Sequence, residues 1–301
     1  MTYVITGATG NTGGIIASRL LAQDQQVRVI GRSAERLQSL VNLGGEPHLC
    51  DLTDTAGLAA AFTGARAVYA MIPPNLTSPD YRGYQGLVSH SIATALAQTG
   101  VKHVVALSSV GADKSERTGP VLGLHYFAEQ LNRIPLLNVL HLRAGYFMEN
   151  TLSQIGVIKT MGVTAGPLRP DLKLPMIATR DIASAAAEAL LRLDFSGQQT
   201  RELLGQRDIS MQEATTVIGK AIDKPQLAYV QVSDEQFIAA LTQLGMSSNV
   251  AGLILEMSAA LNSGHMAALE TRSAANTTET SYETFVAEEF VPRFRGQSAA
   301  A

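Results

Sequence analysis

The stretch "YVITGATGNTGG", residues 3–14, decides the fold. A short apolar run leads directly into three glycines spaced three apart, Gly7, Gly10 and Gly13. A strand that passes through such a turn into a helix lets the backbone approach a pyrophosphate, and the helix N-terminus offers free N–H groups and a positive dipole. The same glycines would also suit a tight turn that binds no ligand. We expect a dinucleotide-binding turn that includes Gly7, Thr9, Gly10, Asn11, Thr12 and Gly13.

Apolar runs and helical stretches alternate along the rest of the first half. This alternation predicts βαβ units with a parallel sheet, and the near-continuous apolar strands predict helices on both faces. The expected fold class is therefore α/β, a Rossmann-like doubly wound parallel sheet with a smaller C-terminal substrate lobe. The expected strands are 3–6, 26–31, 46–50, 67–72, 103–109 and 138–143, and the expected helices are 13–23, 33–45, 55–64, 80–99 and 122–132.

The pattern changes after about residue 145. Helices are expected at 178–193, 210–222, 233–245 and 249–264, strands at 201–205 and 227–233, and a polar loop at 271–281. Ser33 is expected to cap the helix at 33–45, and Ser210 followed by Glu213 is a capping-box pattern that marks a helix start. We expect an NADP-binding domain over residues 1–150. Residues 151–301 are expected to form a smaller, mostly helical lobe that faces the substrate, with segments that return to the sheet.

The composition excludes several classes of protein. The 301 residues are 46% hydrophobic and 16% charged, with a net charge of −3 and no basic block, so nucleic acid is not an expected partner. Cys50 is the only cysteine, which fits a reducing compartment, and we expect a cytoplasmic protein. The N-terminus lacks signal-peptide features, and no apolar run is long enough to predict a membrane span. The histidines show no metal-ligand spacing, so no metal site is expected.

The end of the second strand indicates which nicotinamide cofactor binds. An acidic residue there would hold the ribose 2′-hydroxyl of NAD, whereas this chain has Arg32, whose guanidinium suits the 2′-phosphate of NADP. Ser33 and Arg36 are placed to add contacts. A solvated arginine at a strand end is the alternative. We expect NADP(H) as the cofactor.

Further cofactor contacts are expected where later strands end. Asp51 and Leu52 are expected to flank the adenine, although Asp51 could instead cap the next helix. Phe147, with Met148 and Asn150, is expected at the nicotinamide end, although packing in the core is the alternative for Phe147. The remaining candidates at the carboxyl edge of the sheet are Met71, Ile72, Pro73 and Ser108.

These residues together resemble the short-chain dehydrogenase superfamily and, more closely, its atypical NmrA-like branch. The resemblance rests on "ITGATGNTG" (5–13), Arg32, "LRAGYFMEN" (142–150) and "DIASAAAEAL" (181–190). The stretch "VSDEQFIAALTQLG" (232–245) is similar to the C-terminal part of bacterial quinone oxidoreductase type 2 members. The resemblance implies a Rossmann-like fold that binds NADP(H). For function it implies either NADPH-dependent reduction, as of quinones, or NADP sensing without turnover.

The chain departs from the superfamily at the catalytic helix. Ser108 and Ser109 match the superfamily's serine position and Tyr126 its tyrosine, but Gln130 stands where a lysine is expected. Because an amide carries no charge, Tyr126 is not expected to act as a general base. His125 and Glu129 instead match a His-x-x-x-Glu pattern of the branch, and their spacing places them on one helix face. His125 could relay a proton, or the pair could be structural. The candidate catalytic residues are His125, Tyr126 and Ser109.

Two functions remain open, with a third less favoured. The first is an NADPH-dependent oxidoreductase that reduces a quinone or another planar, apolar small molecule by hydride transfer without a Tyr–Lys pair. The second is a non-catalytic NADP(H) sensor that reports redox state to a protein partner. A sugar-nucleotide epimerase or dehydratase would need the intact pair. The sequence leaves the oligomeric state open.

Overall fold

A seven-stranded parallel sheet forms the centre of the structure, a computed structural model that describes residues 2–296. The strands lie in the order β10-β6-β5-β4-β1-β2-β3. This arrangement confirms the predicted α/β, Rossmann-like class. The strands are β1 (Thr2–Ile5), β2 (Val27–Gly31), β3 (Glu46–Leu49), β4 (Ala65–Ala70), β5 (His103–Ser109), β6 (Asn138–Ala144) and β10 (Gln198–Leu203).

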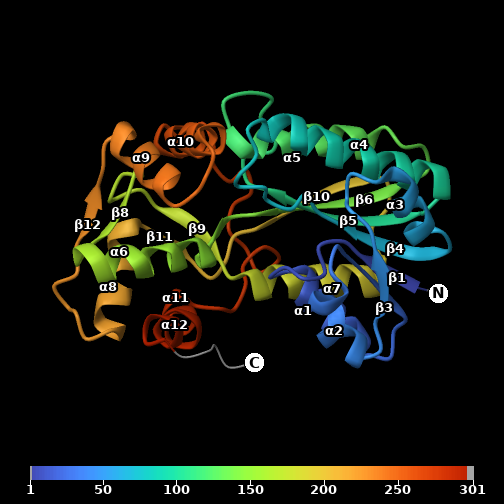
Figure 1. Cartoon of the computed structure of the whole chain (residues 1–301), viewed down its shortest axis with the longest axis horizontal. Helices are drawn as coiled ribbons and strands as arrows, with labels where there is room; N and C mark the ends of the chain where they lie inside the picture. The colour runs from blue at the N-terminus through green and yellow to red at the C-terminus, as the bar shows by residue number, and fades with distance from the viewer. Residues whose placement is uncertain (1, 297–301) are drawn as a thin grey trace.

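Helices cover both faces of this sheet (Figure 1). On one face α1 (Gly13–Leu21), α2 (Ala34–Asn42) and α7 (Thr179–Arg192) enclose a core that includes Ile16, Leu37 and Ile182. On the other face α3 (Thr55–Phe62), α4 (Tyr81–Thr99) and α5 (Leu122–Asn132) enclose a second core. Within residues 2–296, no helix has both the length and the apolar character needed to cross a membrane.

The strand order reverses between β1 and β4. The connections from β1 run outward to β2 and β3, and the chain then returns to place β4 on the other side of β1. Crevices at such a switch point, beyond the carboxyl ends of the strands, are where doubly wound sheets bind their ligands. The fold thus places the glycine-rich turn after β1 beside the residues that follow β4.

Most of the second half forms a separate lobe, seen at the left of Figure 1. The predicted strand near residue 229 pairs with β8 inside this lobe, whereas the strand predicted at 201–205 is β10 and joins the main sheet. Helix α7 also packs on the main sheet, so two segments beyond residue 150 return to it. The lobe contains the strands β7 (Tyr146–Phe147), β8 (Thr164–Gly166), β9 (Leu174–Ile177), β11 (Asp208–Ile209) and β12 (Tyr229–Gln231). Its longer helices are α6 (Gln154–Met161), α8 (Met211–Ala221), α9 (Asp234–Gln243) and α10 (Ser248–Asn262). The short helix η1 (Gly119–Val121) leads into α5 and packs against α10, and η2 (Met148–Ser153) follows β7.

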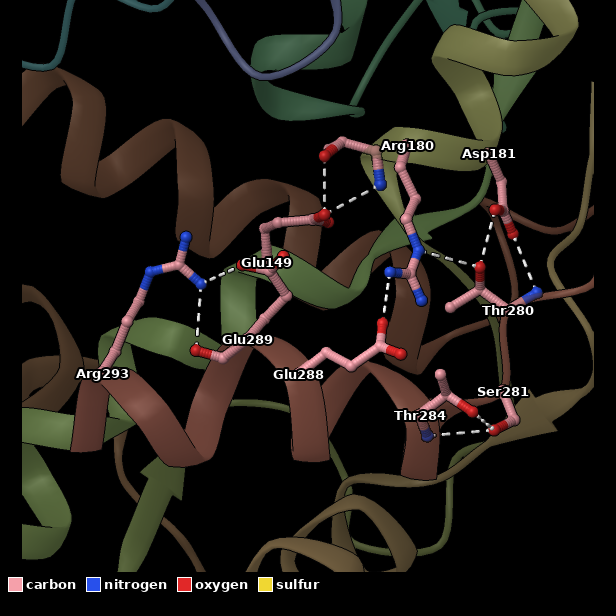
Figure 2. Close-up of polar contacts among 10 residues, drawn as sticks. Glu149, Arg180, Asp181, Thr280, Ser281, Thr284, Glu288, Glu289 and Arg293 are labelled. Carbon is pink, nitrogen blue, oxygen red and sulfur yellow. Dashed lines mark hydrogen bonds and ion pairs between the residues drawn. The ribbon is translucent and has the colours of Figure 1, made fainter. Parts of the chain in front are cut away.

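A C-terminal helical segment completes this lobe. It consists of α11 (Tyr282–Phe285), the π-helical turn η3 (Val286–Phe290) and α12 (Val291–Phe294), none of which the sequence analysis predicted. Tyr282, Phe285 and Phe290 are buried in the core of the lobe. Figure 2 shows how this segment reaches α7: Arg180 forms an ion pair with Glu288, and the Asp181 carboxylate accepts hydrogen bonds from Thr280.

Glu149 caps the first turn of α7 from outside the helix. One of its oxygens accepts hydrogen bonds from the backbone N–H and the hydroxyl of Thr179, at 2.9 and 2.6 Å (Figure 2). These bonds satisfy an N–H that the start of a helix otherwise leaves unpaired. Burial raises the pKa of Glu149, and the nearby Glu289 carboxylate adds to this, while the bonds from Thr179 oppose it.

The replacement Glu149→Gln should therefore remove a pH-dependent loss of folding stability. It keeps a carbonyl oxygen for the Thr179 donors but carries no charge. Because the folded-state pKa of Glu149 is raised, the native protein should lose stability relative to the variant as the pH rises from about 4 through that pKa. The loss is about 1.4 kcal/mol for each unit by which the pKa is raised. Urea unfolding at a series of pH values measures this difference. Glu188→Gln, an exposed change on the same helix, is the control, and a pH-independent difference for Glu149→Gln would contradict the account.

Candidate functional site

The glycine-rich turn after β1 requires glycine at two of its positions. Gly7 has a φ of +61°, and a Cβ there would lie 2.7 Å from the sulfur of Met71. A Cβ on Gly13 would lie 2.3 Å from the Gly7 carbonyl oxygen, so the start of α1 packs directly against the turn. No side chain caps α1. The Gly14 N–H donates to the Gly10 carbonyl at 3.0 Å, and the positive end of the α1 dipole still suits an anion such as the expected pyrophosphate.

Two threonines and a tyrosine anchor this turn to β4. The buried Tyr69 hydroxyl donates to Oγ1 of Thr12 at 2.9 Å, and Thr6 Oγ1 donates to the Tyr69 carbonyl at 3.0 Å. Burial raises the pKa of Tyr69, so the phenol remains protonated and can donate. The Thr12 hydroxyl uses one acceptor position in this bond and keeps its own O–H as a donor for the predicted cofactor contact. Asn11 and Gly10 lie on the exposed side of the turn.

A small pocket lies beyond the turn, between the ends of β2 and β3. Six of the predicted cofactor residues line it: Gly7, Thr9, Arg32, Asp51, Leu52 and Pro73. The Arg32 side chain is 77% exposed, and its nearest guanidinium nitrogen is 3.9 Å from an Asp51 oxygen. Ser33 and Arg36, which were expected to add contacts, also line it. The remaining lining residues, Ile30, Gly31, Cys50 and Tyr84, were not predicted as site residues.

The structure gives Asp51 and its neighbours distinct roles. Burial opposes ionisation of Asp51, but hydrogen bonds from Thr53 and the nearby Arg32 together lower its pKa. Asp51 does not cap α3; that cap is Asp54, which accepts from the N–H groups of Ala56 and Gly57. Burial, with the carboxylates of Asp54 and Asp51, raises the pKa of the Cys50 thiol to about 11. Ser33 caps α2, as expected.

A larger cavity of about 700 Å³ lies on the other side of the turn. Six of the residues predicted for the site line it: Met71, Ile72, Ser108, Ser109, Phe147 and Asn150. The opposite wall comes from the second lobe and was not predicted. Its apolar residues include Tyr146, Leu172, Leu174, Met257, Leu261 and Met266. The cavity therefore lies between the two halves of the chain.

Helix α10 is held over this cavity by polar contacts at its middle and near its start. Glu256 forms a two-oxygen contact with Arg82, at 3.0 Å to each oxygen, and one of these oxygens also accepts from the N–H of Gly119. Near its start, Asn249 accepts from the N–H of Tyr81, and Ser247 binds the carbonyl of Ser78. These contacts hold Met257 and Leu261 in the cavity wall.

Few polar groups face the cavity from the carboxyl ends of the strands. The Ser109 hydroxyl donates to the Val110 carbonyl at 3.0 Å. Burial raises the pKa of Tyr146 to about 12, although a hydrogen bond with Asn150 opposes the shift. Asn150 lines the cavity, as predicted, but Met148 is wrongly placed by the sequence analysis, because its side chain is buried in the core of the second lobe.

His125 and Tyr126 lie outside both pockets within the described part of the chain. Val121, which ends η1, and Leu124, on α5, face the cavity. The turn of 100° per residue rotates Tyr126 to the far side of α5, where it is 48% exposed. His125 Nδ1 lies 3.0 Å from the Ala112 carbonyl, and its Nε2 lies 3.6 Å from Glu129. The geometry therefore favours the structural alternative for His125 and Glu129, and it places neither His125 nor Tyr126 in the lining of the cavity.

Comparison with known proteins identifies relatives over most of the chain. A (4-alkanoyl-5-oxo-2,5-dihydrofuran-3-yl)methyl phosphate reductase from Streptomyces griseus is 29% identical over 74% of this chain and 74% of its own length. Quinone oxidoreductase 2 from Escherichia coli is 26% identical over 86% of this chain and 88% of its own length.

Solved structures show the same fold. That of an NADPH-dependent quinone oxidoreductase from Escherichia coli, complexed with NADPH, superimposes with a TM-score of 0.75. The match covers 100% of this chain and 96% of that one, at 21% identity. The model of the NmrA-like family matches residues 1–291, and the chain therefore belongs to the NmrA-like family.

Proposed function

We propose that this protein is an NADPH-dependent reductase of a planar, apolar acceptor of the quinone type. The observation that carries the proposal is that its two pockets meet at the glycine-rich turn. Gly7 lines the small pocket, Met71 lines the large one, and the two residues are in contact. An extended dinucleotide placed along this edge would have its adenosine near Arg32 and its nicotinamide at the cavity.

The residues present fit such a cofactor. The uncapped start of α1 and the close-packed glycines suit a pyrophosphate, and Arg32 offers a permanently charged partner for a 2′-phosphate. When bound, NADPH would supply a hydride. The relatives named as reductases, and the structure that holds NADPH, support this assignment.

The cavity itself suits an acceptor that needs orientation more than acid catalysis. Its wall is mostly apolar, with aromatic rings at Tyr146 and Phe147, and so favours a flat, apolar ligand. Holding the acceptor in a water-poor space against the nicotinamide end supplies the orientation that hydride transfer requires. The reduced acceptor takes its proton from water, because a quinone is electrophilic enough to be reduced without a strong general acid.

A non-catalytic NADP(H) sensor is the second candidate. It is favoured by one observation, that neither His125 nor Tyr126 lines the cavity and Gln130 replaces the lysine. The deciding experiment follows the loss of NADPH absorbance with a panel of quinones, while NADPH affinity is measured in parallel. Reduction of quinones supports the reductase. Tight NADPH binding without turnover of any acceptor would reject it and leave the sensor.

Replacing Arg32 with alanine should discriminate between the two nicotinamide cofactors. Loss of one charge-assisted phosphate contact should weaken NADPH binding roughly ten- to a hundredfold and leave NADH binding nearly unchanged. Calorimetric titration with each cofactor measures both affinities. Arg192→Ala, an exposed arginine on α7, is the control. Equal affinities of the native protein for NADPH and NADH would reject the preference for NADP.

Tyr126→Phe should leave quinone-dependent NADPH oxidation within about tenfold of the native rate. Essential acid–base groups contribute more, typically ~100- to 10,000-fold, and Tyr126 faces away from the cavity. His125→Ala should lower thermal stability, because it removes the contact with the Ala112 carbonyl, while the rate also stays within about tenfold. Steady-state kinetics and thermal melts test both variants. A loss above about a hundredfold at unchanged NADPH affinity, in either variant, would restore that residue to catalysis.

A further inference from the structure

The side chain of Gln85 places an amide in the wall of the large cavity. Gln85 lies on α4, is 3% exposed, and donates from Nε2 to the Pro120 carbonyl at 2.9 Å. The Pro120 carbonyl can only accept a hydrogen bond, so the NH2 group of the Gln85 amide must face it. The amide oxygen, Oε1, therefore lies on the opposite side of the amide from the NH2 group. Among residues 2–296, that oxygen, Oε1, has no hydrogen-bond partner.

A glycine on the neighbouring helix makes room for this amide. A Cβ on Gly123 would lie 2.3 Å from both the Cδ and the Oε1 atoms of Gln85. A glycine inside a helix makes that helix less stable than an alanine would. Glycine at position 123 thus lowers the local stability of α5 but leaves room for a polar side chain in a mostly apolar wall.

Ser108 is a second buried polar group in the same wall. It ends β5, is 4% exposed, and its hydroxyl has no partner among the described residues, whereas the hydroxyl of the adjacent Ser109 is paired. A buried polar group left unpaired destabilises the folded protein, because it has lost its hydrogen bonds to water without replacing them. Both Gln85 and Ser108 would therefore favour a ligand that brings its own hydrogen-bonding group into the cavity.

We propose that the cavity recognises flat aromatic ligands through a hydroxyl group, which donates a hydrogen bond to Oε1 of Gln85, while Ser108 binds an oxygen of the same ligand. The proposal deepens the proposed function and rests on it for the reaction. Reduction of a quinone by one hydride and one proton converts two carbonyl oxygens into hydroxyls. The Gln85 oxygen, an acceptor, thus matches the hydroquinone product or a hydroxyl already present on the substrate. Gln85 is a positioning and specificity residue in this scheme.

Binding of two shape-matched probes tests the proposal without any turnover. 1-Naphthol and 1-methylnaphthalene differ by a hydroxyl in place of a methyl group, and each is small enough to reorient in the cavity. Their dissociation constants are measured by calorimetry on the native protein and on Gln85→Leu. The ratio of the two affinities should shift against naphthol by about three- to tenfold in the variant, the equivalent of one hydrogen bond. Comparing ratios cancels the difference in hydration of the two probes.

Controls separate this effect from general damage. Gln38→Leu, an exposed change on α2, should leave the ratio unchanged, and Gln85→Met replaces Gln85→Leu if the latter does not fold. An equal loss for both probes, an unchanged ratio, or no naphthol binding by the native protein would overturn the proposal. Because no cofactor turnover is measured, a shifted ratio in a protein that reduces no acceptor would support Gln85 recognition and reject only the reductase.

Discussion

The contact between the Gly7 carbonyl and the backbone of Gly13 is the constraint on which the site depends. It brings the first turn of α1 against the end of β1, so that the helix N-terminus points at the crevice where the strand order reverses. The Tyr69–Thr12 hydrogen bond then holds the turn to β4, the strand that leads into Met71 and Ile72. Both pockets are therefore positioned by one short stretch of backbone.

The second lobe covers this edge of the sheet and so forms the large cavity. Its attachments are polar and lie at helix ends: Glu256 joins α10 to the start of α4, and Glu149, Arg180 and Asp181 join the start of α7 to the segments around it. The first turn of a helix carries unpaired N–H groups. A carboxylate placed there therefore gains both hydrogen bonds and a favourable interaction with the helix dipole. The apolar wall is thus held in place by contacts made outside it.

The sequence was informative where the structure depends on local chemistry. The glycine pattern, Arg32 and the caps at Ser33 and Ser210 follow from backbone conformation and short-range bonds, and the structure places each near its expected position. The division at residue 150 and the roles of the site residues remain predictions. Cavity residues such as Tyr81, Gln85 and Met257 could not be predicted, since only tertiary packing brings α4, α5 and α10 together. The position of Tyr126 outside the cavity could not be predicted, because a motif position does not state which way its helix faces. The spacing of Tyr282, Phe285, Val286 and Phe290 could have revealed the C-terminal helical segment.

The methionines of the cavity wall have a consequence of their own. Met71, Met257 and Met266 come from three separate segments, and each is an unbranched thioether that changes rotamer at low cost. Such a wall adapts its shape to the ligand, so the cavity favours ligands of several shapes over a close fit to a single one. The same sulfur atoms are open to oxidation, and a sulfoxide at any of the three would replace an apolar surface by a polar, chiral one. Oxidation of Met257 or Met266 would therefore alter the selectivity of the cavity alone, whereas oxidation of Met71, whose sulfur lies against Gly7, would also disturb the glycine-rich turn.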